Sequence, residues 1–164
     1  AFFVWVTEIT STSSGIEFYK GVDMAFTDLG NNGYDLYIVS HRTKYGMGNS
    51  SNINIRKISS ERIFNWIYRE KLSTLISGVV FCETNVEKIQ TIKQISPEII
   101  IDDLEKIHFE CMKFQKVNYE YKNILFNGAS ISMEGGKYLD SNLIELNSWR
   151  QISDKLITKW NEIS

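Results

Sequence analysis

The sequence of 164 residues is 43% hydrophobic and 23% charged, which is ordinary globular usage and suits a single domain, residues 1–164, with a buried core. Its formal net charge of -2 at pH 7 gives no general attraction to polyanions, so we expect no nucleic-acid partner and no membrane partner. The apolar opening, residues 1–6, lacks the basic flank of a signal peptide and is too short to span a bilayer, so a buried strand is expected there.

The two cysteines, Cys82 and Cys111, lie in apolar or helical surroundings and lack the CxxC spacing of redox and zinc sites. A disulfide or a zinc site is therefore less favoured than two buried, reduced thiols. Reduced thiols in turn favour a cytoplasmic location.

The first half of the chain predicts strands separated by helices. After the opening strand and a polar loop, hydrophobic residues recur at helical spacing at Phe18, Val22, Phe26 and Leu29. The Gly-Asn-Asn-Gly segment, residues 30–33, ends this helix, and residues 34–39 form the continuous apolar run of a strand buried on both faces. Beyond a polar stretch, residues 44–58, Ser59 is expected to cap a second helix that turns Ile63, Trp66 and Ile67 toward the core, with Phe64 as a further candidate.

The second half continues the same alternation. Residues 78–82 predict a strand, and Thr84 with Glu87 has the spacing of a capping box that begins a helix with Val86, Ile89, Ile92 and Ile95 on its apolar face. Pro97 ends that helix, and strands are expected at residues 99–101 and 123–126 on either side of a less regular helix. Ser148 and Gln151 again have capping-box spacing and begin a terminal helix whose apolar face carries Trp149, Ile152, Leu156 and Trp160.

These elements predict an α/β fold with a doubly wound, mainly parallel sheet of five strands and helices on both faces. In such sheets ligands bind at the carboxyl ends of the strands, where this sequence places polar residues after strands 34–39 and 99–101. The first set begins with Ser40, and the second is the adjacent acid pair Asp102 and Asp103. Repulsion between the two carboxylates would be relieved by a hard cation such as Mg²⁺, although either aspartate alone could cap the following helix.

Three segments together resemble the haloacid dehalogenase-like superfamily. They are the strand ending in Ser40-His41-Arg42-Thr43-Lys44, the helical Glu87-Lys88-Ile89, and the strand ending in Ile101-Asp102-Asp103-Leu104. Their order is similar to that of the family's serine, lysine and acidic motifs, and the segments look most like capless members from sugar and polysaccharide biosynthesis loci. The loops after the first two strands are too short for a separate cap domain.

The resemblance implies a role for each of these residues. Ser40 would hydrogen-bond a phosphoryl oxygen, Lys88 would neutralise the nucleophile and the phosphate, and Asp102 would hold Mg²⁺ with support from Asp103. His41 and Arg42 would contact the substrate. Simpler roles remain for some of them: Ser40 as a turn or helix cap, and His41 and Lys88 as solvated residues. Lys93 and Lys106 are alternatives to Lys88.

The family's nucleophile is absent from the expected place. The resemblance puts the nucleophilic Asp-x-Asp motif at the end of the first strand, near Trp5 and Thr7, and neither side chain can attack phosphorus as a carboxylate does. Glu8 is the nearest acid, but it lies one residue out of this pattern and would point to the other side of an extended chain. Any magnesium site would therefore be weak.

Two functions from different classes follow. The first is a Mg²⁺-dependent phosphatase-type hydrolase, or its degenerate descendant, that acts on a phosphorylated sugar or polysaccharide precursor. The second is a non-catalytic binding or interaction module that keeps the fold, which the missing Asp-x-Asp motif favours. A response-regulator receiver is a weaker match, because its acidic pair follows the first strand and here the pair follows the fourth.

Overall fold

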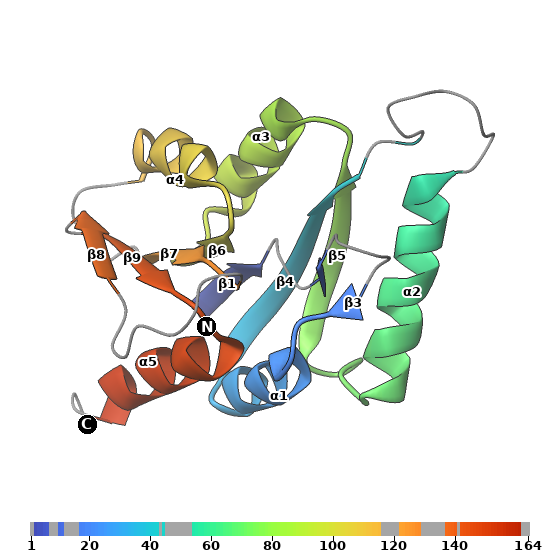
Figure 1. Cartoon of the computed structure of the whole chain (residues 1–164), viewed down its shortest axis with the longest axis horizontal. Coiled ribbons are helices and arrows are strands. Elements are labelled where there is room, and N and C mark those ends of the chain that lie inside the picture. Colours follow the sequence, from blue (N-terminus) through green and yellow to red (C-terminus); the bar gives the residue numbers. More distant parts are fainter. Residues whose placement is uncertain are drawn as a thin grey trace.

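The computed structural model of the chain describes residues 2–6, 10–11, 17–42, 44, 54–115, 122–128, 137–140 and 142–161. These residues form a layered α/β structure in which one sheet separates two groups of helices (Figure 1). The helices are α1 (Val22–Asn31), α2 (Ile55–Arg69), α3 (Asn85–Ile95), α4 (Glu105–Met112) and α5 (Trp149–Asn161). The main strands are β1 (Phe2–Val6), β4 (Tyr34–His41), β5 (Ile76–Cys82), β6 (Ile99–Asp102), β7 (Lys122–Phe126), β8 (Lys137–Asp140) and β9 (Leu143–Leu146). A separate small antiparallel pair joins β2 (Thr10–Ser11) to β3 (Glu17–Phe18).

The main sheet has the strand order β5-β4-β1-β6-β7-β9-β8. Each neighbouring pair is parallel except β8 and β9, which are antiparallel. The predicted class, α/β with a mainly parallel sheet, is confirmed, but the number of five strands is wrong because β9 and β8 extend the sheet to seven. These two strands have four residues each, and such short segments carry too few residues to establish an apolar run.

The helices cover both faces of the sheet. In Figure 1, α3 and α4 lie above the sheet, α1 and α5 lie below it, and α2 lies beside β5. The side chains of β4 alternate accordingly, so that Leu36 and Ile38 join the core with α1, α2 and α5, whereas Val39 joins the core with α3 and α4. The continuous apolar runs that predicted buried strands therefore supply two cores, one on each face.

An aromatic cluster holds the larger core together. Its six rings contact one another in series. The series begins on β3, passes through α2, α1, α5 and β7, and ends at the residue that follows β3. In order they are Phe18, Trp66, Phe26, Trp149, Phe126 and Tyr19, with neighbouring ring centroids 4.6–5.7 Å apart. Such edge and offset contacts add to the burial of apolar area, and they fix α1 against α5.

The starts of the helices test the predicted caps. Thr84 Oγ1 accepts a hydrogen bond from Glu87 N (3.1 Å), and Ser148 Oγ accepts one from Gln151 N (3.2 Å), so both caps are confirmed. The cap of α2 was predicted wrongly: Asn54 is the cap, and its side chain accepts from Lys57 N. Ser59 lies buried in the second turn instead. Asparagine ranks with serine as a cap, so composition could not choose between them.

Among the described residues, no helix combines the length and the hydrophobicity needed to cross a lipid bilayer.

Candidate functional site

The carboxyl ends of β4, β1 and β6 lie next to one another at one edge of the sheet. β1 pairs with β4 on one side and with β6 on the other, and Val6 is level with both Ile38 and Ile101. Ser40 lies two positions beyond Ile38 and Asp102 one position beyond Ile101, and only β1 lies between their strands. Two inter-strand spacings put their backbones about 10 Å apart.

Lys88 and Asp102 form a buried ion pair at this edge. Lys88 Nζ lies 2.6 Å from Asp102 Oδ2, and the two residues are 3% and 0% exposed. Asp102 Oδ1 accepts a second hydrogen bond from the backbone N–H of Leu104 (2.8 Å). The Thr84 cap sets the start of α3 so that Lys88 lies one turn in and faces β6, whereas Lys93 and Lys106 are exposed. The lysine and the first aspartate singled out in the sequence are therefore in contact.

A buried chain of polar side chains extends from this ion pair through α4 to β7. His108 on α4 donates from Nε2 to the backbone carbonyl of Asp102 (3.1 Å), and its Nδ1 lies 3.3 Å from Asn123 Oδ1. Asn123 on β7 then donates from Nδ2 to Gln115 Oε1 (3.0 Å). His108 and Asn123 are 0% and 1% exposed. The sequence interpretation missed both, although the position of His108 next to Ile107 on the inner face of α4 was a usable signal.

Cys111 also lies against this polar chain. It is fully buried, and burial raises the pKa of its thiol to about 12, with a smaller contribution from the negative charge of Asp102. Burial likewise raises the pKa of the Cys82 thiol. Both cysteines are free, as the sequence predicted, and neither is in the thiolate form that nucleophilic chemistry requires.

The other predicted segment, Ser40 to Arg42, lies at the end of β4. Ser40 is 7% exposed. Alternation along β4 places its side chain on the same face as Leu36 and Ile38, which α1 and α2 cover. Alternation along β6 places Asp102 on the other face of the sheet, which α3 and α4 cover. His41 donates from Nε2 to the backbone carbonyl of Glu83 (3.0 Å), and Arg42 N donates to the Cys82 carbonyl (3.1 Å).

A second ion pair supports this loop from α2. Arg56 Nη2 lies 2.5 Å from Glu83 Oε1, and Arg56 Nε donates to the Arg42 carbonyl (3.3 Å). The segment after β4 is thereby tied to the segment after β5. The loop after Ser40 is therefore held in place by α2 and β5, and Ser40 itself lies on the opposite face of the sheet from Lys88 and Asp102.

The predicted metal ligands have unequal surroundings. Asp102 is fully buried with a partner on each carboxylate oxygen, whereas Asp103 is exposed. Partial desolvation raises the pKa of Asp103, the charge of Asp102 raises it further, and the nearby Lys88 opposes both. Within the described part of the chain, no three His, Cys, Asp or Glu side chains gather into a group that could hold a metal ion. Asp102 and Asp103 are the described carboxylates that could contribute to a Mg²⁺ site, and Asp102 would have to exchange one of its present partners for the ion.

The end of β1 carries no carboxylate in its described part. Residues Phe2–Val6 are all apolar, and Trp5 pairs with Tyr37 and Ile100. Trp5 is therefore level with Ile100, two residues before Asp102 on β6, so it does not lie at the strand end beside Asp102. Thr7 and Glu8, the other two positions considered for the nucleophile, lie outside the described residues.

No known family model matches the chain, and no curated protein matches it. Solved structures do resemble its fold. D,D-heptose 1,7-bisphosphate phosphatase from Burkholderia thailandensis aligns with a TM-score of 0.61 at 10% identity, over 96% of this chain and 99% of that one. The enzyme of the same name from B. bronchiseptica, solved with magnesium and phosphate, aligns with a TM-score of 0.64 at 6% identity, over 97% and 99%. At these identities the likeness concerns the fold alone: the chain shares the α/β fold of these two phosphatases.

Proposed function

We propose that this chain is a degenerate descendant of haloacid dehalogenase-type phosphohydrolases. In this proposal it binds a phosphorylated sugar or polysaccharide precursor at the strand ends and hydrolyses it at a rate near background. The observation that carries the proposal is the buried contact between Lys88 and Asp102. A lysine and an aspartate meet at the edge of the sheet where α/β folds bind ligands, yet each satisfies the other's charge.

Binding would use the groups at the end of β4, and the ion pair would act from the end of β6. The Ser40 hydroxyl can donate to a phosphoryl oxygen, and the guanidinium of Arg42 offers planar donors that match phosphate geometry. His41 would help to shape the loop after Ser40 through its bond to the Glu83 carbonyl. Lys88 would act at longer range, because its ammonium group is already committed to Asp102. Binding then depends mainly on Ser40 and Arg42.

Hydrolysis would be slow for two reasons. First, the described strand β1 carries no carboxylate to attack phosphorus, and charge-stabilising groups act only on charge that develops after such an attack. Second, Asp102 is held by Lys88 and Leu104 N, so a Mg²⁺ ion would have to compete for its oxygens. Removing a nucleophile normally lowers the rate by several orders of magnitude, more than the remaining groups restore.

One observation favours a second candidate, an active Mg²⁺-dependent phosphohydrolase. The pKa of Asp103 is raised in part by the negative charge of Asp102, and a cation bound between the two carboxylates would relieve this repulsion. The same fold does hold magnesium with phosphate in the B. bronchiseptica phosphatase. The two candidates differ in turnover rather than in where the phosphate binds.

Calorimetry with a hexose monophosphate tests the binding half of the proposal. We expect saturable binding that weakens about tenfold in Ser40→Ala, which corresponds to the loss of one hydrogen bond to a charged group, about 1.4 kcal/mol. Ser77→Ala on the exposed part of β5 is the matched control and should bind as the parent chain does. Equal affinity in Ser40→Ala and the parent would remove Ser40 from the site.

A further inference from the structure

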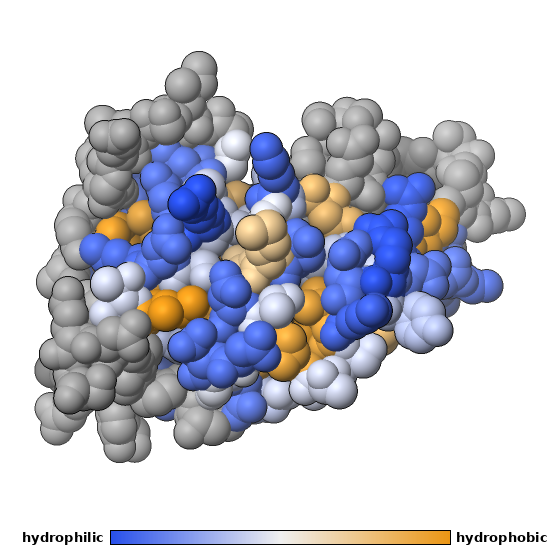
Figure 2. Space-filling model, turned by 90° about the horizontal axis from the view of Figure 1, so that it is seen from below, coloured by the Kyte–Doolittle hydropathy of each residue, from blue (hydrophilic) through white to orange (hydrophobic). Residues whose placement is uncertain are grey.

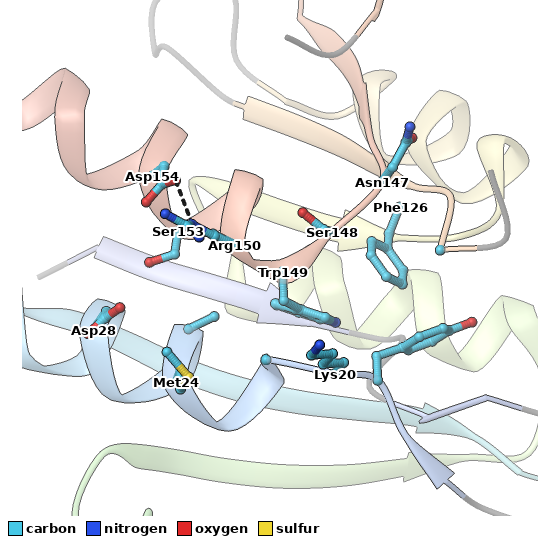
Figure 3. A pocket seen from close by; sticks show the side chains of 14 residues that line it. Lys20, Met24, Asp28, Phe126, Asn147, Ser148, Trp149, Arg150, Ser153 and Asp154 are labelled. Carbon is cyan, nitrogen blue, oxygen red and sulfur yellow. Dashed lines mark ion pairs between the residues drawn. The ribbon is translucent and has the colours of Figure 1, made fainter. Parts of the chain in front are cut away.

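A pocket of about 770 Å³ lies between α1 and α5, and it shares no lining residue with the strand-end site. Figure 2 shows the face of the molecule seen from below in Figure 1, where hydrophobic residues appear as small patches among hydrophilic ones. The pocket is lined by residues from the start of α1, the end of β7 and the first turns of α5, which Figure 3 shows from close by.

One end of the pocket gathers hydrogen-bond donors. The fully buried side chain of Trp149 forms part of the wall, and its Nε1–H has no hydrogen-bond partner among the described residues. In Figure 3 the indole nitrogen is at the end of the ring on the Phe126 side, and Lys20 is drawn below the ring. Lys20 is exposed and forms no ion pair with any described carboxylate. Two donors therefore line the same pocket, and neither has an acceptor or an ion-pair partner among the described residues.

The first turn of α1 adds a third group of donors at the same end. Gly21 is the N-cap, with a φ of 83°, and no side chain hydrogen-bonds to the first backbone amides of the helix. The space where a Cβ would extend from Gly21 is open, so a ligand can approach the backbone closely. The first amide, Val22 N, donates to the Tyr19 carbonyl (3.3 Å). The next amides and the positive end of the helix dipole favour an anion, against the single negative charge of Asp23 in the same turn. A buried donor without a partner is unfavourable, and an oxyanion acceptor would satisfy it.

The other end of the pocket gathers acceptors. Asp28 on α1 and Asp154 on α5 line it, and the only ion pair there among the described residues is the loose one between Arg150 Nε and Asp154 Oδ2 (3.8 Å). Asp28 follows Gly21 by seven residues of helix, so the two ends are roughly 10 Å apart. The pocket thus has hydrogen-bond donors at one end and carboxylate acceptors at the other.

We propose that this pocket binds a small, elongated oxyanion. Its anionic end lies against Lys20, Trp149 Nε1 and the first turn of α1, and its far end presents hydroxyl or ammonium donors to Asp28 and Asp154. The indole nitrogen is buried in the free chain, so ligand binding must displace a neighbouring side chain for the N–H to reach the anion. The proposal does not depend on the proposed function, because it uses none of the residues at the strand ends.

The indole N–H resonance of Trp149, assigned through its backbone connections, reports on this site directly. The probes are inorganic phosphate, which offers the anionic end alone, glucosamine 6-phosphate, which offers both ends, and glucosamine without phosphate. We expect phosphate and glucosamine 6-phosphate to shift the resonance saturably, the latter with a Kd about tenfold lower, and glucosamine alone to leave it unchanged. A Kd for glucosamine 6-phosphate no lower than that of phosphate would overturn the assignment of the acidic end.

Three variants separate this site from others. Lys20→Met should abolish the shift caused by phosphate, whereas Lys57→Met, which removes an exposed lysine on α2, should keep it. Asp28→Asn combined with Asp154→Asn should reduce the affinity for glucosamine 6-phosphate to that for phosphate. Ser40→Ala should keep the shift, since it affects only the strand ends. A shift that survives Lys20→Met, or disappears in Ser40→Ala, would overturn the proposal.

Discussion

The strand-end cluster and the pocket between α1 and α5 differ in whether their polar groups have partners within the chain. At the strand ends, Asp102 is fully buried and both of its oxygens have partners within the chain. In the pocket, the indole N–H of Trp149 has no partner among the described residues, and Lys20 has no ion-pair partner among them. A matched buried cluster supports the fold, whereas unmatched groups around a cavity are free to bind a ligand.

This difference predicts that the same kind of substitution will lower stability in one region and ligand binding in the other. Changing a member of the matched cluster leaves its partner buried and uncompensated, which lowers the free energy of unfolding. Changing an exposed donor of the pocket removes no internal contact, so it alters ligand binding and leaves stability nearly unchanged.

The largest effect is expected from Lys88→Met. It leaves the Asp102 carboxylate buried without its cation and should lower the free energy of unfolding by about 3–5 kcal/mol in urea titrations. Adding Asp102→Asn to this variant removes the uncompensated charge and should recover much of the loss. Equal stability of Lys88→Met and the parent chain would show that the pair is not a buried, compensated unit.

A smaller loss is expected from His108→Leu. The leucine leaves the buried Asp102 carbonyl without the hydrogen bond that the imidazole donates from Nε2 and removes the polar contact of Nδ1 with Asn123, and an unsatisfied buried group costs about 1–3 kcal/mol. Chemical denaturation measures the loss, and hydrogen exchange at the β6 and β7 amides should rise with it. Glu110→Gln on the same helix is a control, since its ion pair with Lys113 is at the surface.

Lys20→Met sharpens the comparison because it is the same chemical change made in the pocket. The exposed Lys20 has no internal ion pair to lose, so we expect a change in unfolding free energy below about 0.5 kcal/mol. Thermal and urea denaturation of this variant beside Lys88→Met give the contrast in one experiment. A loss as large as that of Lys88→Met would contradict the distinction between the two regions.

The smallest effect concerns Asp103, whose raised pKa makes its protonated form more favourable in the folded state. Its contribution to stability is therefore present below the ordinary aspartate pKa and is lost as the pH rises through the raised value. Asp103→Asn lacks this titration, so its stability relative to the parent should increase as the pH rises over that range. Unfolding curves of both chains from pH 3 to 7, a range chosen to bracket ordinary aspartate titration, measure the difference. A difference that decreases with rising pH would reverse the assigned sign.

The sequence predicted those parts of the fold that depend on local patterns. Continuous apolar runs identified five strands, and the Thr84 and Ser148 caps were predicted from their spacing; both are confirmed because apolar runs and capping pairs involve residues close together in the chain. The structure places Ser40 and Asp102 at the ends of β4 and β6, on either side of β1, and places Lys88 against Asp102. Their roles in a binding site remain predictions.

The parts that sequence reasoning missed depend on contacts between distant residues. His108 and Asn123 meet across 15 residues, and neither belongs to a recognisable motif. The pocket joins Lys20 to Trp149, more than 100 residues away, so no local pattern could predict that their donors would meet. The short strands β8 and β9 are stabilised by pairing with the sheet rather than by their own hydrophobic pattern.

Turnover and binding measured together on the unmodified chain test the central proposal most directly. A hexose monophosphate is incubated with the protein and Mg²⁺ while phosphate release is followed, and calorimetry gives the affinity under the same conditions. The proposal predicts saturable binding that depends on Ser40, with phosphate release near the uncatalysed background. Robust Mg²⁺-dependent release that Asp102→Asn abolishes would contradict it, and would show that the chain has a nucleophile outside the described strand β1.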